Sequence, residues 1–382
     1  MLGRRQHMAL ALTAVLAATA AWTNHARQES GRAAPVGSAA RGFTLVASGG
    51  VLPQASVIDR AAYDAGESGY DFRSMLADVE PVVSRADLAL CHMDTVYGTG
   101  GVRSRRPAFT SPPQIAQGLT ATGYDGCSTA SDHALDDGAA GIRRTLDAMD
   151  EAGLRHNGTA RSVAEARSVM IFRAGPARVA HLSYTLDTNG RPLPAGEPWA
   201  VSLVDEQRVI ADARAARRAG ADVVVVSVHW GTEPQDEPNG QQLALARRLT
   251  ASNTAGRPDI DLILGIHAHV PQAYEKVNGT WVIYGMGDQI PGGPADGHGV
   301  RDPRGNESTL GRFTFTPPAR PGGRWQVTRA EFIPQWFDLE AGRVVDLNRA
   351  IGDGAELGAV RDRIRDVVLS RGAAKDGLVM GE

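Results

Sequence analysis

The chain has 382 residues, of which 42% are hydrophobic, 22% charged and 5% aromatic, with a formal net charge of −3. This length allows one large domain or two of ordinary size, and the apolar content is sufficient for a substantial core, which excludes a disordered protein. The chain has no block of Lys and Arg and few aromatic residues on which bases could stack, so we do not expect nucleic acid as a partner.

The first residues have the composition of an export signal. Arg4 and Arg5 precede an apolar segment, Met8–Trp22, that is short for a membrane span. We therefore expect residues 1–26 to be a cleaved signal peptide or, alternatively, an N-terminal membrane anchor, and residues 27–41 to be a flexible linker. Either outcome places the rest of the chain outside the cytoplasm, secreted or held at the outer face of the membrane.

Three strands are expected early in the folded region, each followed by glycine or polar residues. Gly42–Ser48 ends at Gly49-Gly50, and the apolar run Ala86–Cys91 is followed by His92 and Asp94. The third candidate, Tyr124–Thr129, precedes Asp132 and His133, and an amphipathic helix is expected over 139–152. The loop over 98–113 carries Arg103, Arg105 and Arg106, which could bind an anionic polymer, although a solvated loop is the simpler interpretation.

Cys91 and Cys127 lie near the ends of two of these strands. In an exported protein they could pair if the strands are neighbours. We favour two buried free thiols, because neighbouring strands often hold cysteines too far apart or pointing apart.

Two later apolar runs place histidines at strand ends. Asp222–Trp230 carries His229 at the end of a valine run, and Asp259–Val270 contains His267 and His269 after Gly265, which would allow a sharp turn. Such runs fit parallel strands buried on both faces, whose carboxyl ends collect ligands. Imidazole is a common ligand of zinc and similar ions, so these histidines predict a metal site along one rim of a sheet.

The remaining elements complete an α/β pattern. Helices are expected over 205–218 and 241–251, and Asn278-Gly279 predicts a hairpin between Tyr274–Val277 and Trp281–Tyr284. Late strands over 312–316 and 325–338 and a final helix over 353–370 follow. Alternating strands and helices favour a parallel core with antiparallel strands added late.

The series of strand ends resembles the bacterial capsule-synthesis CapA family, the poly-γ-glutamate biosynthesis proteins, which have the calcineurin-like metallophosphoesterase fold. The resemblance runs from Phe43 to Ile290, and its segments are ADLALCHMDTV, GYDGCSTASDHALDDG, VVVVSVHWGTEPQDEPNGQQLALA, DLILGIHAHVPQ and VIYGMGDQ. It implies a four-layer α/β/β/α sandwich of the metallophosphoesterase type over 42–311. Residues 312–382 would add C-terminal strands and a helix packed on this core.

Two motifs of the family are intact and four are changed. The His-Trp-Gly motif is His229-Trp230-Gly231, and the H-x-H motif is His267-Ala268-His269. The changed motifs are the Gly-Asp after the first strand, here Gly49-Gly50; the Glu after the second, here Asp94; the Asn-His after the third, here Asp132-His133; and the late Gly-Asn, here Gly287-Asp288.

Carried over residue by residue, the resemblance implies a metal site. One cation position keeps its full ligand set of Asp94, Asp132, His229 and His267, which suffices for a divalent ion of the Mn, Zn or Fe type. The other position lacks the first-strand carboxylate, because Gly50 stands there, and retains Asp94 and His269. We expect at least one ion, and up to two.

The resemblance also implies roles for residues beside the metal. His133 would stabilise charge or protonate the leaving group, while His92, Trp230 and Asp288 would contact substrate. Trp230 could equally pack against the sheet. Asp136 and Asp137 are interpreted as a helix cap and a solvated charge.

The leading hypothesis is a metal-dependent hydrolase or transferase in capsule or poly-γ-glutamate-type polymer synthesis. It would act on a phosphoester, or on an amide of an anionic polymer. The alternative is a catalytically degenerate protein that binds polymer or scaffolds an assembly complex, and Gly50 is the best support for it. The step from fold to function is an analogy.

Overall fold

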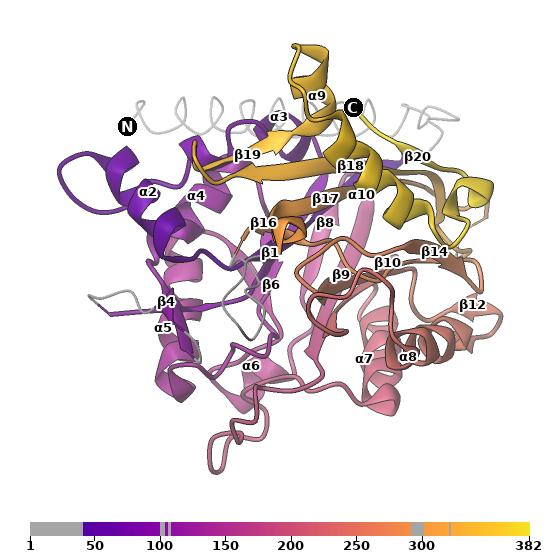
Figure 1. The fold of residues 1–382 in the computed structure, drawn as a ribbon. Coiled ribbons are helices and arrows are strands. Elements are labelled where there is room, and N and C mark those ends of the chain that lie inside the picture. Colours follow the sequence, from indigo (N-terminus) through magenta and orange to yellow (C-terminus); the bar gives the residue numbers. More distant parts are fainter. Residues whose placement is uncertain (1–40, 100–103, 106–107, 292–301, 321) are drawn as a thin grey trace, which may run out of the picture. The chain divides into compact units, whose positions relative to one another are not determined.

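The computed structural model describes residues 41–99, 104–105, 108–291, 302–320 and 322–382 (Figure 1). The expected signal peptide, almost all of the linker, Arg103 and Arg106 lie outside these residues, as does the side chain of Arg105. Every helix within the described ranges is too short or too polar to serve as a membrane span.

The larger of two main sheets has β1 at its centre. Its strands are β1 (Phe43–Val51), β2 (Leu88–Met93), β6 (Gly126–Ser128), β7 (Arg155–Asn157), β16 (Asp288–Ile290), β17 (Glu307–Thr316), β18 (Gln326–Asp338), β19 (Arg343–Asp346) and β20 (Leu378–Met380). The order is β19-β18-β17-β1-β2-β6-β7, with β16 beside β1 and β20 beside β18. β1, β2, β6 and β7 run parallel, whereas β17 and β18 are antiparallel additions.

The second sheet has the order β14-β15-β13-β10-β9-β8. Its strands are β8 (Ile171–Ala174), β9 (Ala177–Thr185), β10 (Val223–Trp230), β13 (Leu262–His267), β14 (Tyr274–Val277) and β15 (Thr280–Ile283). The predicted hairpin is confirmed as β14 and β15. Two small sheets contain β3 (Val96–Tyr97), β4 (Ser104–Arg105) and β5 (Ala108–Ser111), and β11 (Asn253–Thr254) and β12 (Arg257–Pro258).

The helices cover the outer faces of the two sheets. Those with apolar residues in the core on the larger sheet are α2 (Ala55–Ala65), α3 (Glu80–Val83), α4 (Gln114–Thr122) and α5 (Gly138–Glu151). On the second sheet lie α7 (Glu206–Arg218) and α8 (Gly240–Ala251). A third core lies between the sheets, so the expected four-layer α/β/β/α sandwich is confirmed (Figure 1). The remaining helices are α6 (Val163–Ala166), α9 (Leu347–Gly352) and α10 (Gly358–Leu369).

β10 shows how the sequence builds these layers. Val223 and Val225 lie in the core between the sheets, while Val224 and Val226 lie in the core under α7 and α8. Successive side chains of a strand point to opposite faces, so a pure valine run is buried on both. The same alternation directs His229 between the sheets.

Two features of the fold differ from the sequence-based expectations. Ala55–Ala65 forms a helix that was not predicted, in which Val57, Ile58 and Ala61 are buried. The expected boundary after residue 311 falls inside β17, which pairs with β1 from Phe43↔Phe315 to Ala47↔Gly311. The C-terminal strands therefore extend the larger sheet, and the boundary is corrected.

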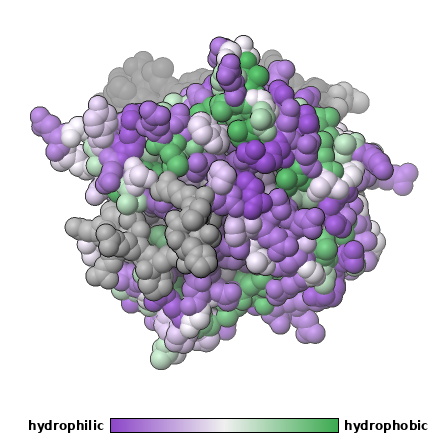
Figure 2. Space-filling model, in the orientation of Figure 1, coloured by the Kyte–Doolittle hydropathy of each residue, from purple (hydrophilic) through white to green (hydrophobic). Residues whose placement is uncertain are grey.

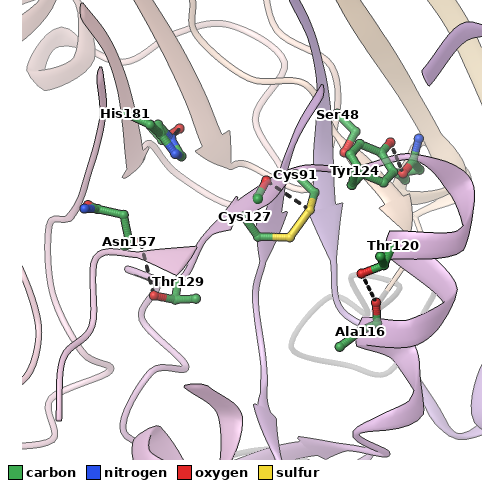
Figure 3. The surroundings of a disulfide bond; sticks show 12 residues. Ser48, Cys91, Ala116, Thr120, Tyr124, Cys127, Thr129, Asn157 and His181 are labelled. Carbon is green, nitrogen blue, oxygen red and sulfur yellow. Dashed lines mark hydrogen bonds between the residues drawn. A yellow bond between two sulfur atoms is a disulfide. The ribbon is translucent and has the colours of Figure 1, made fainter. Parts of the chain in front are cut away.

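Cys91 and Cys127 form a disulfide bond (Figure 3), which corrects the expectation of two free thiols. The two residues are direct partners in the parallel pairing of β2 with β6, and their Cα atoms are 4.3 Å apart. Paired residues on adjacent strands share a face, so both side chains point into the core under the helices. The bond ties together the strands that precede Asp94 and Asp132.

The face shown in Figure 2 is mainly hydrophilic, with apolar side chains dispersed over it. The exposed large hydrophobic residues among those described are Tyr63, Val163 and Val379. Apolar residues exposed singly are normal on a folded protein and do not mark a docking surface.

Candidate metal centre

Imidazole and carboxylate side chains converge where strands of both sheets end. His92 lies on β2 and His229 on β10, while His267 ends β13. Three groups of side chains each bring their ligand atoms within 4.8 Å of one another: His92, Asp94 and His229; Asp132, His229 and His267; and Glu233, His267 and His269. The five predicted metal ligands are therefore brought together, but at strand ends of both sheets and not along one rim of a single sheet, which corrects the prediction.

The surroundings of the Asp94 carboxylate give the strongest indication of a cation-binding site. Asp94 is fully buried, and neither carboxylate oxygen has a hydrogen-bond partner among the described residues. The Nε2 atoms of His92 and His229 each lie 3.8 Å from Asp94 Oδ1, which is too long for a hydrogen bond. Two ligands with bonds of roughly 2.0–2.2 Å to one ion can be this far apart. Because a buried charge without donors is costly, the arrangement fits a cation.

His229 links the two acidic residues. Its Nε2 lies 3.0 Å from Asp132 Oδ1, and its Nδ1 lies 3.0 Å from His92 Nε2. Burial opposes charge on His229, but Asp94 and Asp132 outweigh it and raise the pKa of His229 above its usual value. Burial lowers the pKa of His92, so a neutral His92 can accept the Nδ1–H of His229 and orient its ring.

His267 and His269 turn the chain at the end of β13. Both have positive φ angles, 112° and 57°, which are uncommon for residues other than glycine and concentrate at functional sites. Gly265, in contrast, lies within the strand, where a Cβ would be 2.2 Å from the carbonyl oxygen of Tyr284. Gly265 therefore permits close packing within the strand. The turn that was predicted at Gly265 is made by His267 and His269 instead.

The donor set fits a divalent cation. His267 Nδ1 is buried without a hydrogen-bond partner among the described residues and lies 3.9 Å from Asp132 Oδ2. Together with Asp94 and His229, these residues offer two carboxylates and two imidazoles, a set that suits Mn, Zn or Fe(II). We call Asp94, Asp132, His229 and His267 the first cation position.

Glu233 is a site residue that the sequence-based prediction missed. It lies on the loop after β10, with Oε1 3.4 Å from His269 Nε2 and 3.9 Å from His267 Nδ1. Burial would raise the pKa of Glu233, but the hydrogen bond and charge of His269 lower it to about 2. Its position four residues after His229, at the same strand end, was the available signal.

The ring of His133 is oriented by a hydrogen bond to Asp136. Its Nδ1 donates to Asp136 Oδ2 at 2.8 Å, and its Nε2 lies 3.9 Å from Asp132 Oδ1. Burial opposes the charged imidazole, but the hydrogen bond to Asp136 and the charges of Asp132 and Asp94 raise the pKa of His133 to about 9. The protonated form of His133 is therefore favoured at neutral pH in the metal-free protein.

The interpretation of Asp136 as a helix cap is wrong. Its carboxylate accepts hydrogen bonds from the backbone N–H of Phe109 at 2.6 Å and from Arg191 Nε at 3.2 Å, in addition to the one from His133. α5 begins at Gly138, and Asp137 at its N-cap makes no capping bond. Phe109 and Arg191 lie far from Asp136 in the sequence, so the local pattern did not reveal these hydrogen bonds.

The three predicted substrate residues are all buried. His92 lies behind His229, and Asp288 Oδ2 accepts a hydrogen bond from His269 Nδ1 at 2.9 Å. Trp230 follows His229 and therefore points to the opposite face of β10, where its Nε1 donates to the carbonyl of Tyr284 at 2.9 Å. This placement supports packing on the sheet and corrects the assignment of Trp230 to substrate contact.

The stabilisation that a metal ion gives is expected to increase with pH. Carboxylates raise the folded-state pKa of His229 and His269 against the effect of burial, so folding of the metal-free protein favours the protonated imidazoles. The free energy that protonation of these histidines contributes to folding is fully present below about pH 6.5. It is lost as the pH rises through the folded-state pKa. A cation binds only the deprotonated nitrogens.

Thermal unfolding with and without Mn²⁺ measures this effect. We expect the rise in Tm on adding Mn²⁺ to be larger at about pH 8.5 than at about pH 6. An equal rise at both values, or a larger one at the lower pH, would contradict proton–metal competition at these histidines.

Comparison with known proteins gives a family and a set of relatives. The family model described as "Bacterial capsule synthesis protein PGA_cap" matches residues 44–292. "Capsule biosynthesis protein CapA" of Bacillus anthracis is 26% identical over 185 residues, covering 48% of this chain and 44% of that protein. "PGA biosynthesis protein CapA" of Bacillus subtilis (strain 168) is 30% identical over 164 residues, covering 43% and 41%. The match thus spans less than half of either relative.

Among solved structures, a 5'-nucleotidase precursor from Thermus thermophilus aligns with a TM-score of 0.48 and 16% sequence identity. The alignment covers 84% of this chain and 59% of that one.

Proposed function

The chain belongs to the bacterial capsule synthesis protein PGA_cap family, and from this membership we propose that it is an extracytoplasmic, metal-dependent hydrolase or transferase in the synthesis of a capsule or poly-γ-glutamate-type polymer. The observation that supports this most is the first cation position, where buried Asp94 lacks hydrogen-bond donors among the described residues and faces His229. The substrate would be a phosphoester or an amide of an anionic polymer. Residues 1–26 would carry the export signal or hold the protein at the membrane.

The site residues would have two roles, binding of a cation and transfer of a proton. A divalent cation at the first position would polarise the substrate and supply an activated water near neutral pH. Asp94 and Asp132 would hold it from the larger sheet, and His229 and His267 would hold it from the second sheet. Asp136 fixes His133 through Nδ1 and favours its protonated form, so that Nε2–H faces the site and can protonate a leaving group.

Replacing His133 with glutamine is expected to lower kcat by about 10²–10⁴-fold, the usual contribution of a general acid. The metal content should not change, because His133 is outside the ligand set. Steady-state kinetics and metal analysis of the same preparation measure both. His156→Gln is a matched control, since His156 is similarly buried but lies on β7 with Asp150 as its partner. A kcat within about threefold of wild type would exclude His133 as the acid.

A polymer-binding or scaffolding protein with a degenerate site is the second candidate. The observation in its favour is Gly50, which leaves the end of β1 without the carboxylate that the family pattern has there. The intact first cation position supports the enzyme instead. Metal binding without turnover would favour the second candidate.

The full chain, reconstituted with Mn²⁺, Zn²⁺ or Fe²⁺, provides the test. Metal content is measured, and turnover is assayed with a generic phosphodiester and with poly-γ-glutamate, whose chain length reports amide cleavage. Metal-dependent turnover supports the proposal. Less than about a tenth of an equivalent of metal per chain would overturn it, because the ligand set would then not function as a site.

A further inference from the structure

His269 lies between two carboxylates that the first cation position does not use. Its Nδ1 is 2.9 Å from Asp288 Oδ2, and its Nε2 is 3.4 Å from Glu233 Oε1. Asp288 is fully buried, whereas Glu233 and His267 are partly exposed. The two carboxylates reach the ring from opposite sides, one from the interior and one from the solvent side.

Asp288 occupies space that Gly50 leaves open. β1 and β16 pair in parallel with Gly50 opposite Asp288, and a Cβ at residue 50 would lie 2.5 Å from Asp288 Oδ1. Real Cβ atoms do not approach an oxygen this closely, so any side chain at residue 50 would displace the Asp288 carboxylate. The negative charge absent from the end of β1 is therefore supplied from β16.

The position of Asp288 determines what His269 can do. With Asp288 accepting the Nδ1–H, the lone pair of Nε2 is directed towards Glu233. A carboxylate behind a histidine in this way fixes the ring and its tautomer and makes the other nitrogen a better metal ligand. Asp288 is thus a positioning residue for His269.

We propose that Glu233 and His269 form a second cation position, with Asp288 holding His269 in the space left by Gly50. This inference rests on the proposed function. The ligand atoms of Glu233, His267 and His269 lie within 4.8 Å of one another. His267 Nδ1 stands between the two positions, 3.9 Å from Asp132 Oδ2 and 3.9 Å from Glu233 Oε1, and one lone pair serves one cation.

The second position has fewer protein ligands than the first, so it should bind its cation more weakly. Coordination sites not filled by protein remain available to water or substrate, as in catalytic metal sites. The partial exposure of Glu233 places these sites towards solvent. The second cation would therefore take an anionic oxygen of the substrate, a phosphate or a carboxylate.

Titration of the full chain with Mn²⁺, followed by calorimetry and metal analysis, tests this position. Wild type should bind two equivalents with unequal affinities, and Glu233→Gln should keep only the tighter one. Glu237→Gln is the matched control, because Glu237 lies exposed on the same loop, and it should keep both. The retained tight equivalent shows that the Glu233 variant is folded.

Two further variants address the role of Asp288. Asp288→Asn removes the charge behind His269 and should weaken the second equivalent by about 10–100-fold, as expected for a partner of a metal ligand. Gly50→Ala should have the same effect by pushing the Asp288 carboxylate aside. Both should leave the first equivalent unchanged.

The outcomes separate this inference from the proposed function. One equivalent in wild type, or two in Glu233→Gln, overturns the second position while the proposed function stands. No bound metal in wild type overturns both. Loss of the weaker equivalent in Glu233→Gln, but not in Glu237→Gln, supports the inference.

Discussion

Replacing His229 with alanine is expected to remove the cation from the first position and to lower turnover by more than about 100-fold. His229 Nε2 faces both carboxylates, at 3.0 Å from Asp132 Oδ1 and 3.8 Å from Asp94 Oδ1. Loss of an outer-shell partner of a metal ligand already costs roughly 10–100-fold in affinity or activity, so loss of a direct ligand should cost more. Metal analysis and phosphodiester turnover measure the two effects.

The same substitution should destabilise the metal-free protein. His229 is buried between Asp94 and Asp132, which favour its protonated form, and removal of one partner from a buried ion pair typically costs about 3–5 kcal/mol. Urea unfolding without metal gives this value. His156→Ala serves as the control, because its partner Asp150 is largely exposed. A His229→Ala protein that keeps a full equivalent of metal, or wild-type turnover, would refute the assignment.

Removal of the disulfide should lower the free energy of unfolding by about 4 kcal/mol. Cys91 and Cys127 are separated by 36 residues, and the chain-entropy model gives about this value for a loop of that length. The double variant Cys91→Ala with Cys127→Ala should unfold at a lower denaturant concentration than oxidised wild type. It should also bind Mn²⁺ more weakly, because the bond ties the strands that precede Asp94 and Asp132.

Reductant provides the control for this prediction. Dithiothreitol should lower the unfolding midpoint of wild type towards that of the double variant and leave the double variant unchanged. A difference below about 1 kcal/mol between wild type and the variant would mean that strand pairing alone holds this region. The disulfide also supports the proposed extracytoplasmic location, since such bonds persist mainly in oxidising compartments.

The sequence by itself determined the elements with strong local signals. The run Val223–Val228 predicted a strand buried on both faces, and the pattern over 205–218 and 241–251 predicted α7 and α8 to within one residue. The strand-end positions of His229 and His267 predicted that these two residues meet, because the neighbouring parallel strands β10 and β13 end at one rim. Asp132 follows β6 in the other sheet, so its place beside them was implied by the family resemblance and depends on how the two sheets pack. These signals depend on side-chain periodicity over a few residues, which is local.

Only the tertiary structure decided which groups are partners. The bond between Cys91 and Cys127 depends on the pairing of β2 with β6. His133 donates a hydrogen bond to Asp136, a buried carboxylate that resembled a helix cap in the sequence. The Asp288 carboxylate fills the space beside Gly50 because the register of β1 and β16 places the two residues opposite each other. Strand order and register are set by packing between segments far apart in the chain, and a shift of one residue reverses the face of every side chain. Local periodicity therefore places the site residues at strand ends, while the packing of the two sheets and the long-range register decide which of them meet.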